Sequence, residues 1–527
     1  MMTRRQTLGS ALALGAAAVA RPAFAAGMFP VVETAQGKLR GLHSGGVAIF
    51  RGVSYAADTS GANRFMPPQP VEPWAGVREA LHWTEIAPQI PGDRRHVYAD
   101  LIMVDRNPSG MGEDNLSLNV WSPGLDPNAK KPVIVVLHGG GFYSGSGNSV
   151  GMEGEQMARF SDCVVIAINH RLGAFGFLHL AEFGGDDFAT SGTVGMQDIV
   201  AALAWIRENV AAFGGDPDRV LVYGQSGGGA KTSVLMAMPG GKGLFHRTGV
   251  MSGSALRMMP PEMASATAKR LMDALEVAPS DVRKLQEVPW TVLLETQAKL
   301  EAADRARGEA PRSFAPVVDG IALPRHPWDP DAPNVSADVP MIVSSVLDER
   351  SYRMGDFSMD EAGLLEFARE RVGERASEAV AAYREEAPDT PPFLLAARLD
   401  SDLTFRKGAF AQAELKAKQE GAPVWTYLWT QPSPAADGRF GAVHGIDVAP
   451  SLYNTRGALN GSSAQANEFA AAIASSWAAF AADGNPNNEH VPDWKPYSPP
   501  ERATLIFDAD LRVENDPRAA FRRFWKP

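Results

Sequence analysis

The stretch "VLVYGQSGGGAKT", Val220 to Thr232, decides the fold, because it admits two incompatible interpretations. Its glycines followed by Lys231 suggest a phosphate-binding loop, whereas Ser226 between glycines suggests a turn that presents a nucleophilic serine. A phosphate loop requires one glycine directly before the lysine and another five positions earlier. Ala230 and Gln225 occupy those two positions, so the phosphate-loop interpretation fails.

The serine turn fits the same residues. A strand that turns sharply into a helix strains the residue between them and leaves no room for side chains two positions away on either side. Gly224 and Gly228 meet that requirement around Ser226. The apolar run 219–224 before the serine predicts a buried strand, and the residues after Gly229 are compatible with a helix. Ser226 is therefore predicted to be the nucleophile of a hydrolase.

Further apolar runs have the length of buried strands and alternate with helical patterns. Buried parallel strands are continuous apolar runs, and strand–helix–strand units produce a parallel sheet covered on both faces. The sequence therefore predicts the α/β class, with a large, mostly parallel sheet. The expected strands are 131–141, 163–171, 219–224, 339–346 and 423–429, with a helix over 196–213. The segments 256–312 and 359–420 are expected to be mainly helical and to surround the entrance to the active site.

A serine nucleophile needs a base, a group that orients the base, and donors for the oxyanion. The "LHGGGF" run at 137–142 follows a predicted strand and offers backbone amides without side chains in the way. The base is expected to be a histidine after the serine. Among the candidates, His444 in "GAVHGID" lies in a glycine-flanked loop after a strand and is preferred. The others are His246, His326 and His490.

The orienting acid is expected to close a strand between the serine and the histidine. "IVSSVLDERSY" places Asp348 and Glu349 directly after the predicted strand 339–346. A carboxylate there would hold the tautomer of the imidazole and stabilise its cation. Glu349 is preferred, and Asp348 and Asp319 remain alternatives.

Composition limits the partners of this chain. The 527 residues carry a net charge of −11, which argues against binding to nucleic acid or to an anionic membrane surface. The single cysteine, Cys163, excludes an intramolecular disulfide and lies in an apolar run, where we expect it to be buried.

The first 25 residues are predicted to be a cleavable export signal. An arginine pair, Arg4 and Arg5, precedes an apolar run that is shorter than the about 20 residues needed to cross a bilayer. The pair resembles a twin-arginine signal, although Thr7 stands where such signals more often have phenylalanine. The ordinary secretory route and an uncleaved tail are the alternatives. We expect a periplasmic or secreted protein whose net charge becomes −14 when residues 1–25, with three arginines and no acid, are removed.

The chain resembles the type-B carboxylesterases, an α/β-hydrolase family that includes the cholinesterases. The resemblance rests on segments spread from about residue 30 to 497. They include "FRGVSYA" (50–56), "EDNLSLNVWSP" (113–123), "INHRLGAFGFL" (168–178), "FGGDPDRVLVYGQSGGG" (213–229) and "WAAFAADGNPN" (477–487). The resemblance implies one α/β-hydrolase domain over 26–527, with helical insertions around the active-site entrance. It also implies an ester hydrolase that works through an acyl-enzyme without metal or organic cofactor.

The family pattern assigns roles to particular residues. It implies Ser226 as nucleophile, Glu349 as acid and His444 as base, with oxyanion amides from Gly140, Gly141 and Gly227. An amide, carbamate or lactone substrate, and a non-catalytic recognition role, are the alternatives to a small-molecule carboxylic ester. The sequence does not predict the oligomeric state.

Three residues near the site depart from the family pattern. Gln225 and Gly227 replace the usual glutamate and alanine, and Asp447 replaces a glutamate. The loss of the glutamate before the serine argues against a cationic, cholinesterase-like substrate.

Overall fold

The structure is a computed structural model that describes residues 27–91, 97–102, 107–307, 314–456 and 458–525. The predicted export signal lies outside the described residues. Within them, no helix combines the length and the apolar character needed to cross a membrane.

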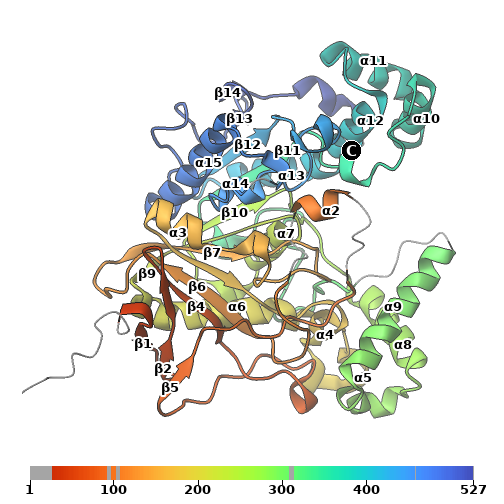
Figure 1. Ribbon diagram of the computed structural model, residues 1–527. Helices are drawn as coiled ribbons and strands as arrows, with labels where there is room; N and C mark the ends of the chain where they lie inside the picture. Colours follow the sequence, from red (N-terminus) through yellow and green to blue (C-terminus); the bar gives the residue numbers. More distant parts are fainter. Residues whose placement is uncertain (1–26, 92–96, 103–106, 308–313, 457, 526–527) are drawn as a thin grey trace, which may run out of the picture.

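An eleven-stranded sheet forms the centre of the molecule (Figure 1). The seven strands from β13 to β8 run parallel to their neighbours, and antiparallel strands lie at both edges. In sheet order the strands are β14 (Arg512–Asn515), β13 (Ala503–Phe507), β12 (Val424–Trp429), β11 (Met341–Val346), β10 (Arg247–Met251), β9 (Gly215–Gln225), β7 (Lys131–Leu137), β8 (Val164–Ile168), β6 (Ser117–Ser122), β4 (Val47–Ser54) and β3 (Leu42–Ser44). The expected mostly parallel sheet and its five predicted strands are confirmed.

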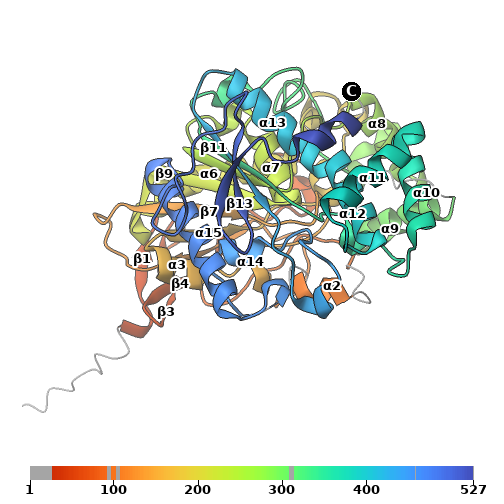
Figure 2. The same cartoon turned by 90° about the horizontal axis from the view of Figure 1, so that it is seen from above.

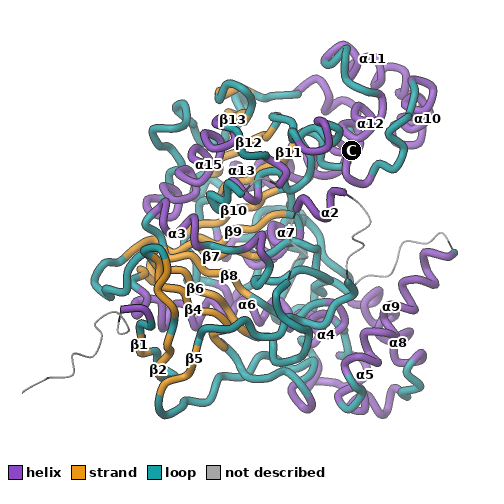
Figure 3. Tube along the Cα trace, in the orientation of Figure 1, coloured by secondary structure: helices purple, strands orange, loops and turns teal. Residues whose placement is uncertain are grey.

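A small second sheet lies near the beginning of the described chain. It contains β1 (Val31–Glu33), β2 (Lys38–Arg40) and β5 (Val77–Glu79). It appears in Figure 3 at the edge of the molecule that carries β4.

Helices cover both faces of the central sheet, as the view from above shows (Figure 2). Alternate residues of β7 belong to different cores: Val133 and Val135 pack with α6 and α7, and Ile134 and Val136 pack with α3 and α15. The α-helices are α2 (Val97–Ile102), α3 (Glu155–Ser161), α4 (Gly173–Phe177), α5 (Ala181–Gly184), α6 (Val194–Asn209), α7 (Gly227–Leu235), α8 (Pro261–Ala274), α9 (Trp290–Ala306), α10 (Glu361–Val372), α11 (Ala376–Glu386), α12 (Pro392–Ser401), α13 (Lys407–Lys418), α14 (Val448–Ser451) and α15 (Ala464–Asp483).

The two segments predicted to be mainly helical contain α8 and α9, and α10 to α13. In Figure 1, α8 and α9 lie below and α10 to α12 lie above the region where α7 begins. Between α12 and α13 the helix widens into a π-helical turn, η11 (Asp402–Arg406), so three labelled elements form one continuous helical path. π-helical turns are often found at functional sites. Cys163 is buried, as expected, and burial raises its pKa to about 11.

Candidate active site

Ser226 stands at the turn between β9 and α7. Its φ and ψ angles, 57° and −120°, lie in a strained region for a residue with a side chain. The glycines two positions away are required by close packing. A Cβ added to Gly224 would lie 2.5 Å from the carbonyl oxygen of Leu137, and one added to Gly228 would lie 2.0 Å from the same atom. The packing constraint inferred from the sequence is thus present at both positions.

The glycine run after β7 lies against this turn. A Cβ at Gly227 would come within 2.3 Å of the amide nitrogen of Gly141, so these two backbones touch. In the described part of the chain, no hydrogen bond occupies the amides of Gly140, Gly141 or Gly227. The structure therefore brings the three predicted oxyanion donors to the strand end that carries Ser226.

Lys231 has a different partner from the phosphate that its position in the sequence first suggested. It is buried in α7, and its Nζ donates a hydrogen bond of 2.9 Å to the carbonyl oxygen of His138, the residue before the glycine run. Burial lowers the pKa of Lys231 well below its usual value. The imidazole of His138 also stacks on that of His170, with ring centroids 4.9 Å apart. This buried cluster fixes the start of the glycine loop.

The two neighbouring acids after β11 have different partners. Glu349 is fully buried, and its Oε1 accepts a hydrogen bond of 2.9 Å from the amide of Val346. Asp348 forms an ion pair with Arg398, with Nε and Oδ1 3.0 Å apart, and accepts a hydrogen bond from the amide of Ala442. Asp348 therefore holds the loop that leads to His444.

His444 lies beside Glu349. Its Nδ1 is 2.5 Å from Oε2 of Glu349, and its carbonyl oxygen accepts a hydrogen bond from the hydroxyl of Tyr98. The side chain of His444 is 5% exposed and that of Glu349 is fully buried, so the pair is shielded from water. A neutral imidazole that donates from Nδ1 to the carboxylate has its lone pair on Nε2. The structure thus brings together the preferred acid and the preferred base.

The alternative residues lie elsewhere. His246 accepts a hydrogen bond from the amide of Val220, His326 accepts one from the amide of Met258, and His490 is exposed. Asp319 accepts a hydrogen bond from the hydroxyl of Thr193 and from two amides of its own turn.

Gln225 has a role that the sequence did not reveal. Its side-chain amide nitrogen lies 3.1 Å from Nε2 of His444, which places an N–H donor against the lone pair of the base. Its side chain is buried next to Ser226. The substitution of the usual glutamate therefore acts directly on the base, as well as changing the charge near the site.

Two aromatic side chains flank the imidazole of His444. The ring of Tyr352 stacks on it with centroids 5.6 Å apart, and the ring of Phe405 in η11 lies 4.9 Å away. The next residue of η11, Arg406, donates from Nη2 to the carbonyl oxygens of Val346 and Leu347, just before the two acids. One π-helical turn therefore contacts both the base and the acid loop.

Asp447, three residues after His444, is fully buried. Its Oδ2 accepts a hydrogen bond of 2.8 Å from the hydroxyl of Tyr427, and its other carboxylate oxygen has no partner in the described structure. Burial raises the pKa of Asp447 to about 7, and the nearby charge of Glu349 adds to this shift. The aspartate that departs from the family pattern is thus a second buried acid close to the site.

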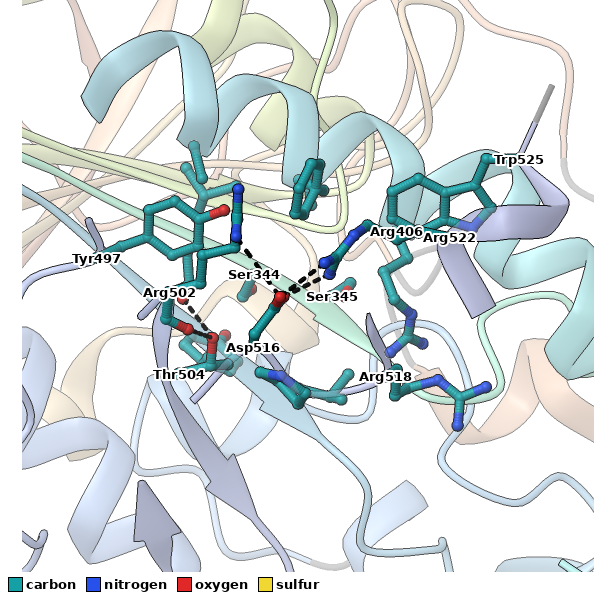
Figure 4. A pocket seen from close by; sticks show the side chains of 18 residues that line it. Ser344, Ser345, Arg406, Tyr497, Arg502, Thr504, Asp516, Arg518, Arg522 and Trp525 are labelled. Carbon is teal, nitrogen blue, oxygen red and sulfur yellow. Dashed lines mark hydrogen bonds and ion pairs between the residues drawn. The ribbon is translucent and has the colours of Figure 1, made fainter. Parts of the chain in front are cut away.

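Arg406 also lines a pocket, which Figure 4 shows from close by. It encloses about 70 Å³ and is lined by Arg406, Arg502, Arg518, Arg522 and Asp516, together with apolar and aromatic side chains. The guanidinium of Arg522 lies against the carboxylate of Asp516, as the dashed lines in Figure 4 show. Arg502 forms ion pairs with Asp516 and with Glu414 of α13, so these charges connect the end of the described chain to α13.

Three side chains that contact His444 were missed from the sequence: Tyr98, Tyr352 and Phe405. The sequence singled out Gln225 beside Ser226 but gave no sign of its contact with the base. Tyr98, Tyr352 and Phe405 lie in segments whose path across the sheet is not encoded in a local pattern. Within the described residues, no three His, Cys, Asp or Glu side chains are grouped so as to hold a metal ion.

Comparisons with known proteins agree with the geometry. Residues 29–525 match the model of the carboxylesterase family. The para-nitrobenzyl esterase of Bacillus subtilis is 33% identical over 502 residues, covering 94% of this chain and 98% of that protein. The phenmedipham hydrolase of Pseudarthrobacter oxydans is 31% identical, covering 92% of this chain and 97% of that protein.

Solved structures extend the likeness to three dimensions. A Geobacillus stearothermophilus carboxylesterase superposes with a TM-score of 0.80 at 33% identity, covering 94% of this chain and all of that one. An esterase from Clostridium hathewayi, described as able to hydrolyse aliphatic aromatic polyesters, gives a TM-score of 0.81 at 31% identity, covering 94% of this chain and 97% of that chain. The fold is that of the α/β-hydrolases. The chain belongs to the carboxylesterase family and is a carboxylic ester hydrolase.

Proposed function

We propose that the chain hydrolyses carboxylic esters with Ser226 as nucleophile, His444 as base and Glu349 as the acid that orients the base. The observation that carries this proposal is the short contact between Nδ1 of His444 and Glu349 beside the strained turn at Ser226. A buried carboxylate in this position fixes the imidazole tautomer and stabilises the imidazolium that forms during the reaction.

In the first half of the reaction, Nε2 of His444 exchanges the amide of Gln225 for the hydroxyl of Ser226. Catalytic hydrogen bonds of this kind often tighten only when substrate is bound. His444 then takes the hydroxyl proton while Oγ attacks the ester carbonyl. The oxyanion accepts hydrogen bonds from the amides of Gly140, Gly141 and Gly227, and the loss of one such donor typically slows turnover by about 10²–10³-fold.

In the second half, the tetrahedral intermediate collapses and the C–O bond to the alcohol breaks. His444 donates its proton to the leaving alcohol, and the acyl group stays on Ser226 as an ester. Water then attacks this acyl-enzyme while His444 again acts as the base, and the acid product leaves. The steps use groups of the chain and one water molecule.

The first test compares the wild-type protein with Ser226→Ala on 4-nitrophenyl esters from acetate to laurate. We expect the variant to lose at least about 10⁴-fold in turnover while its melting temperature stays close to that of the wild type. The chain length with the highest kcat/KM then gives the size of the acyl pocket. Equal rates for both proteins would refute Ser226 as the nucleophile, and amides, carbamates and lactones would be tried next.

We also propose that residues 1–25 direct export, leaving one domain over 26–527. The support is the arginine pair, the apolar run and the Ala23-Phe24-Ala25 cleavage pattern. Mass spectrometry of the protein purified from the periplasm or medium should find Ala26 as the first residue. A protein with Arg4→Lys and Arg5→Lys should remain in the cytoplasm, whereas normal export of this variant would favour the ordinary secretory route.

A further inference from the structure

The donors of the proposed oxyanion hole come from two separate segments of the chain. Gly140 and Gly141 belong to the oxyanion loop, residues 138–141, which follows β7, whereas Gly227 is the first residue of α7. Backbone atoms of the two segments touch, since a Cβ added to Gly227 would lie 2.4 Å from the carbonyl oxygen of Gly141. Contacts of this kind set the closest approach of the two segments but resist their separation only weakly.

Lys231 supplies a directional link between these segments. It lies four residues after Gly227 on the same face of α7, and the side chains of a helix point back toward its N-terminus. Its Nζ donates a hydrogen bond of 2.9 Å to the carbonyl oxygen of His138, the first residue of the oxyanion loop. Within the described residues, no other group of α7 hydrogen-bonds residues 138–141.

Both partners of this hydrogen bond are buried. The amine of Lys231 has no carboxylate partner among the described residues, and burial lowers its pKa well below the usual value. A buried ammonium without a counter-ion is costly, whereas a neutral amine still donates N–H bonds. On the acceptor side, the ring of His138 stacks on that of His170, and its Nδ1 lies 2.8 Å from the carbonyl oxygen of Gly139. The acceptor is therefore held in place on its own side as well.

We propose that Lys231 is a positioning residue, which holds the oxyanion loop at the distance from Gly227 at which all three amides reach the oxyanion. This inference rests on the proposed function of the site. Because the amine is completely buried, it acts on the reaction through the backbone of His138 and not by contact with the substrate. The oxyanion forms only when the ester carbonyl becomes tetrahedral, so alignment of the amides stabilises the transition state more than the bound ester. Lys231 should therefore influence kcat more than KM.

The test replaces Lys231 with methionine, which keeps an unbranched side chain and removes the donor. With 4-nitrophenyl acetate we expect kcat to fall by about 10- to 100-fold, while KM changes by less than about three-fold. A trifluoromethyl ketone with a pentyl chain forms a hemiketal oxyanion on a nucleophilic serine. Its Ki should rise by the same factor by which kcat/KM falls, because both depend on the oxyanion donors.

Lys416→Met is the matched control. Lys416 is also a buried lysine of a helix, α13, and its Nζ donates to the carbonyl oxygens of Ser336 and Ala337. Burial lowers its pKa as well, to about 8. We expect this variant to lose stability, as Lys231→Met does, but to keep the wild-type kcat and Ki, because its acceptors lie outside the oxyanion loop.

Unchanged kcat and Ki in Lys231→Met would overturn the proposal, and so would equal losses of kcat in the two methionine variants. Lys231→Gln, which keeps N–H donors on a shorter side chain, is the second variant and should lie between the wild type and Lys231→Met. If neither Lys231 variant folds while Lys416→Met does, Lys231 supports the whole fold and the positioning proposal fails. A wild type that neither hydrolyses 4-nitrophenyl acetate nor binds the trifluoromethyl ketone would instead refute the proposed function.

Discussion

Arg406 lines the arginine-rich pocket and also contacts the acid loop of the candidate active site. Carboxylates have different partners in these two regions. Around the pocket, acids are bound to guanidinium groups: Asp516, which lines the pocket, to Arg522, and Asp402, which lies outside the lining, to Arg406 and Arg518. In the active site, Glu349 contacts an imidazole and a backbone amide, and no guanidinium of the described residues pairs with it. A guanidinium is charged permanently, so a carboxylate paired with it does not respond when a proton moves. Glu349, whose partners are an imidazole and an amide, can stabilise a charge that appears on the imidazole only during the reaction.

The two arrangements occur at adjacent residues. Asp348 pairs with an arginine, Arg398, as the structural ion pairs do, whereas Glu349 contacts the proposed catalytic base. The comparison therefore predicts that equal amide substitutions at these two positions will have opposite consequences.

Glu349→Gln should have the largest effect. The new amide would donate to Nδ1 of His444 and move the imidazole proton to Nε2, where it blocks the base. We expect kcat to fall by about 10³–10⁴-fold, as in other triads that lose the correct tautomer, with little change in melting temperature. Ester hydrolysis and calorimetry on the same preparation measure both quantities.

Asp348→Asn is the matched control. It would remove the closer of the two carboxylates that pair with buried Arg398 and leave Glu386 at 3.7 Å, and breaking a buried pair typically costs up to about 3–5 kcal/mol. We expect a lower melting temperature, with less than about a ten-fold loss of turnover well below it. If Asp348→Asn instead abolished turnover while Glu349→Gln did not, the roles of the two acids would have to be exchanged.

Gly227→Ala tests the other negative charge of the reaction, the oxyanion, which the amides stabilise without an arginine. The added Cβ would lie 2.3 Å from the amide nitrogen of Gly141, so the oxyanion loop must retreat. We expect kcat to fall by less than the about 10²–10³-fold that follows the loss of one donor, because alanine, the usual residue of the family here, keeps its backbone N–H. Unchanged kinetics would mean that the oxyanion loop can move to make room for the Cβ while its amides still reach the oxyanion.

Asp447→Asn should have the smallest effect and tests a buried acid that has neither an arginine nor a histidine partner. Burial raises the pKa of Asp447 to about 7, above the 3.8 typical of an exposed aspartate. The folded state therefore binds this proton more tightly than the unfolded state, so the acid lowers stability progressively as pH rises from about 4 to about 7.

An asparagine still accepts from Tyr427 and carries no charge. We expect the melting temperature of the variant, relative to the wild type, to be higher at pH 8 than at pH 5 by about 2 °C or more. Thermal unfolding at the two pH values measures this difference. A constant difference at both values would mean that Asp447 does not titrate in this range.

The sequence predicted what depends on short-range packing. Gly224, Ser226 and Gly228 identify the turn because the backbone there admits few residue types, and continuous apolar runs identified the strands of a sheet that is buried on both faces. The site beyond the turn was harder to predict. The ordering of Glu349 over Asp348 came from the family resemblance, because two adjacent acids after one strand are equivalent until the direction of each side chain is known.

The side chains that contact His444 could not be predicted. Tyr352 and Phe405 come from a short 3-10 helix and a widened helical turn, and their positions depend on how long-range elements pack over the strand ends. Nothing in the local sequence indicates that Gln225 reaches the imidazole instead of pointing toward the oxyanion loop, since both lie beside the end of β9.

The π-helical turn η11 makes the chain length between α12 and α13 critical. In a regular helix each residue advances by about 100°, so the removal of one residue from 402–406 would rotate α12 relative to α13 by roughly that angle. Phe405 could then no longer face His444 while Arg406 still reached the acid loop and Asp402. A substitution in this turn should therefore disturb the site less than the insertion or deletion of one residue.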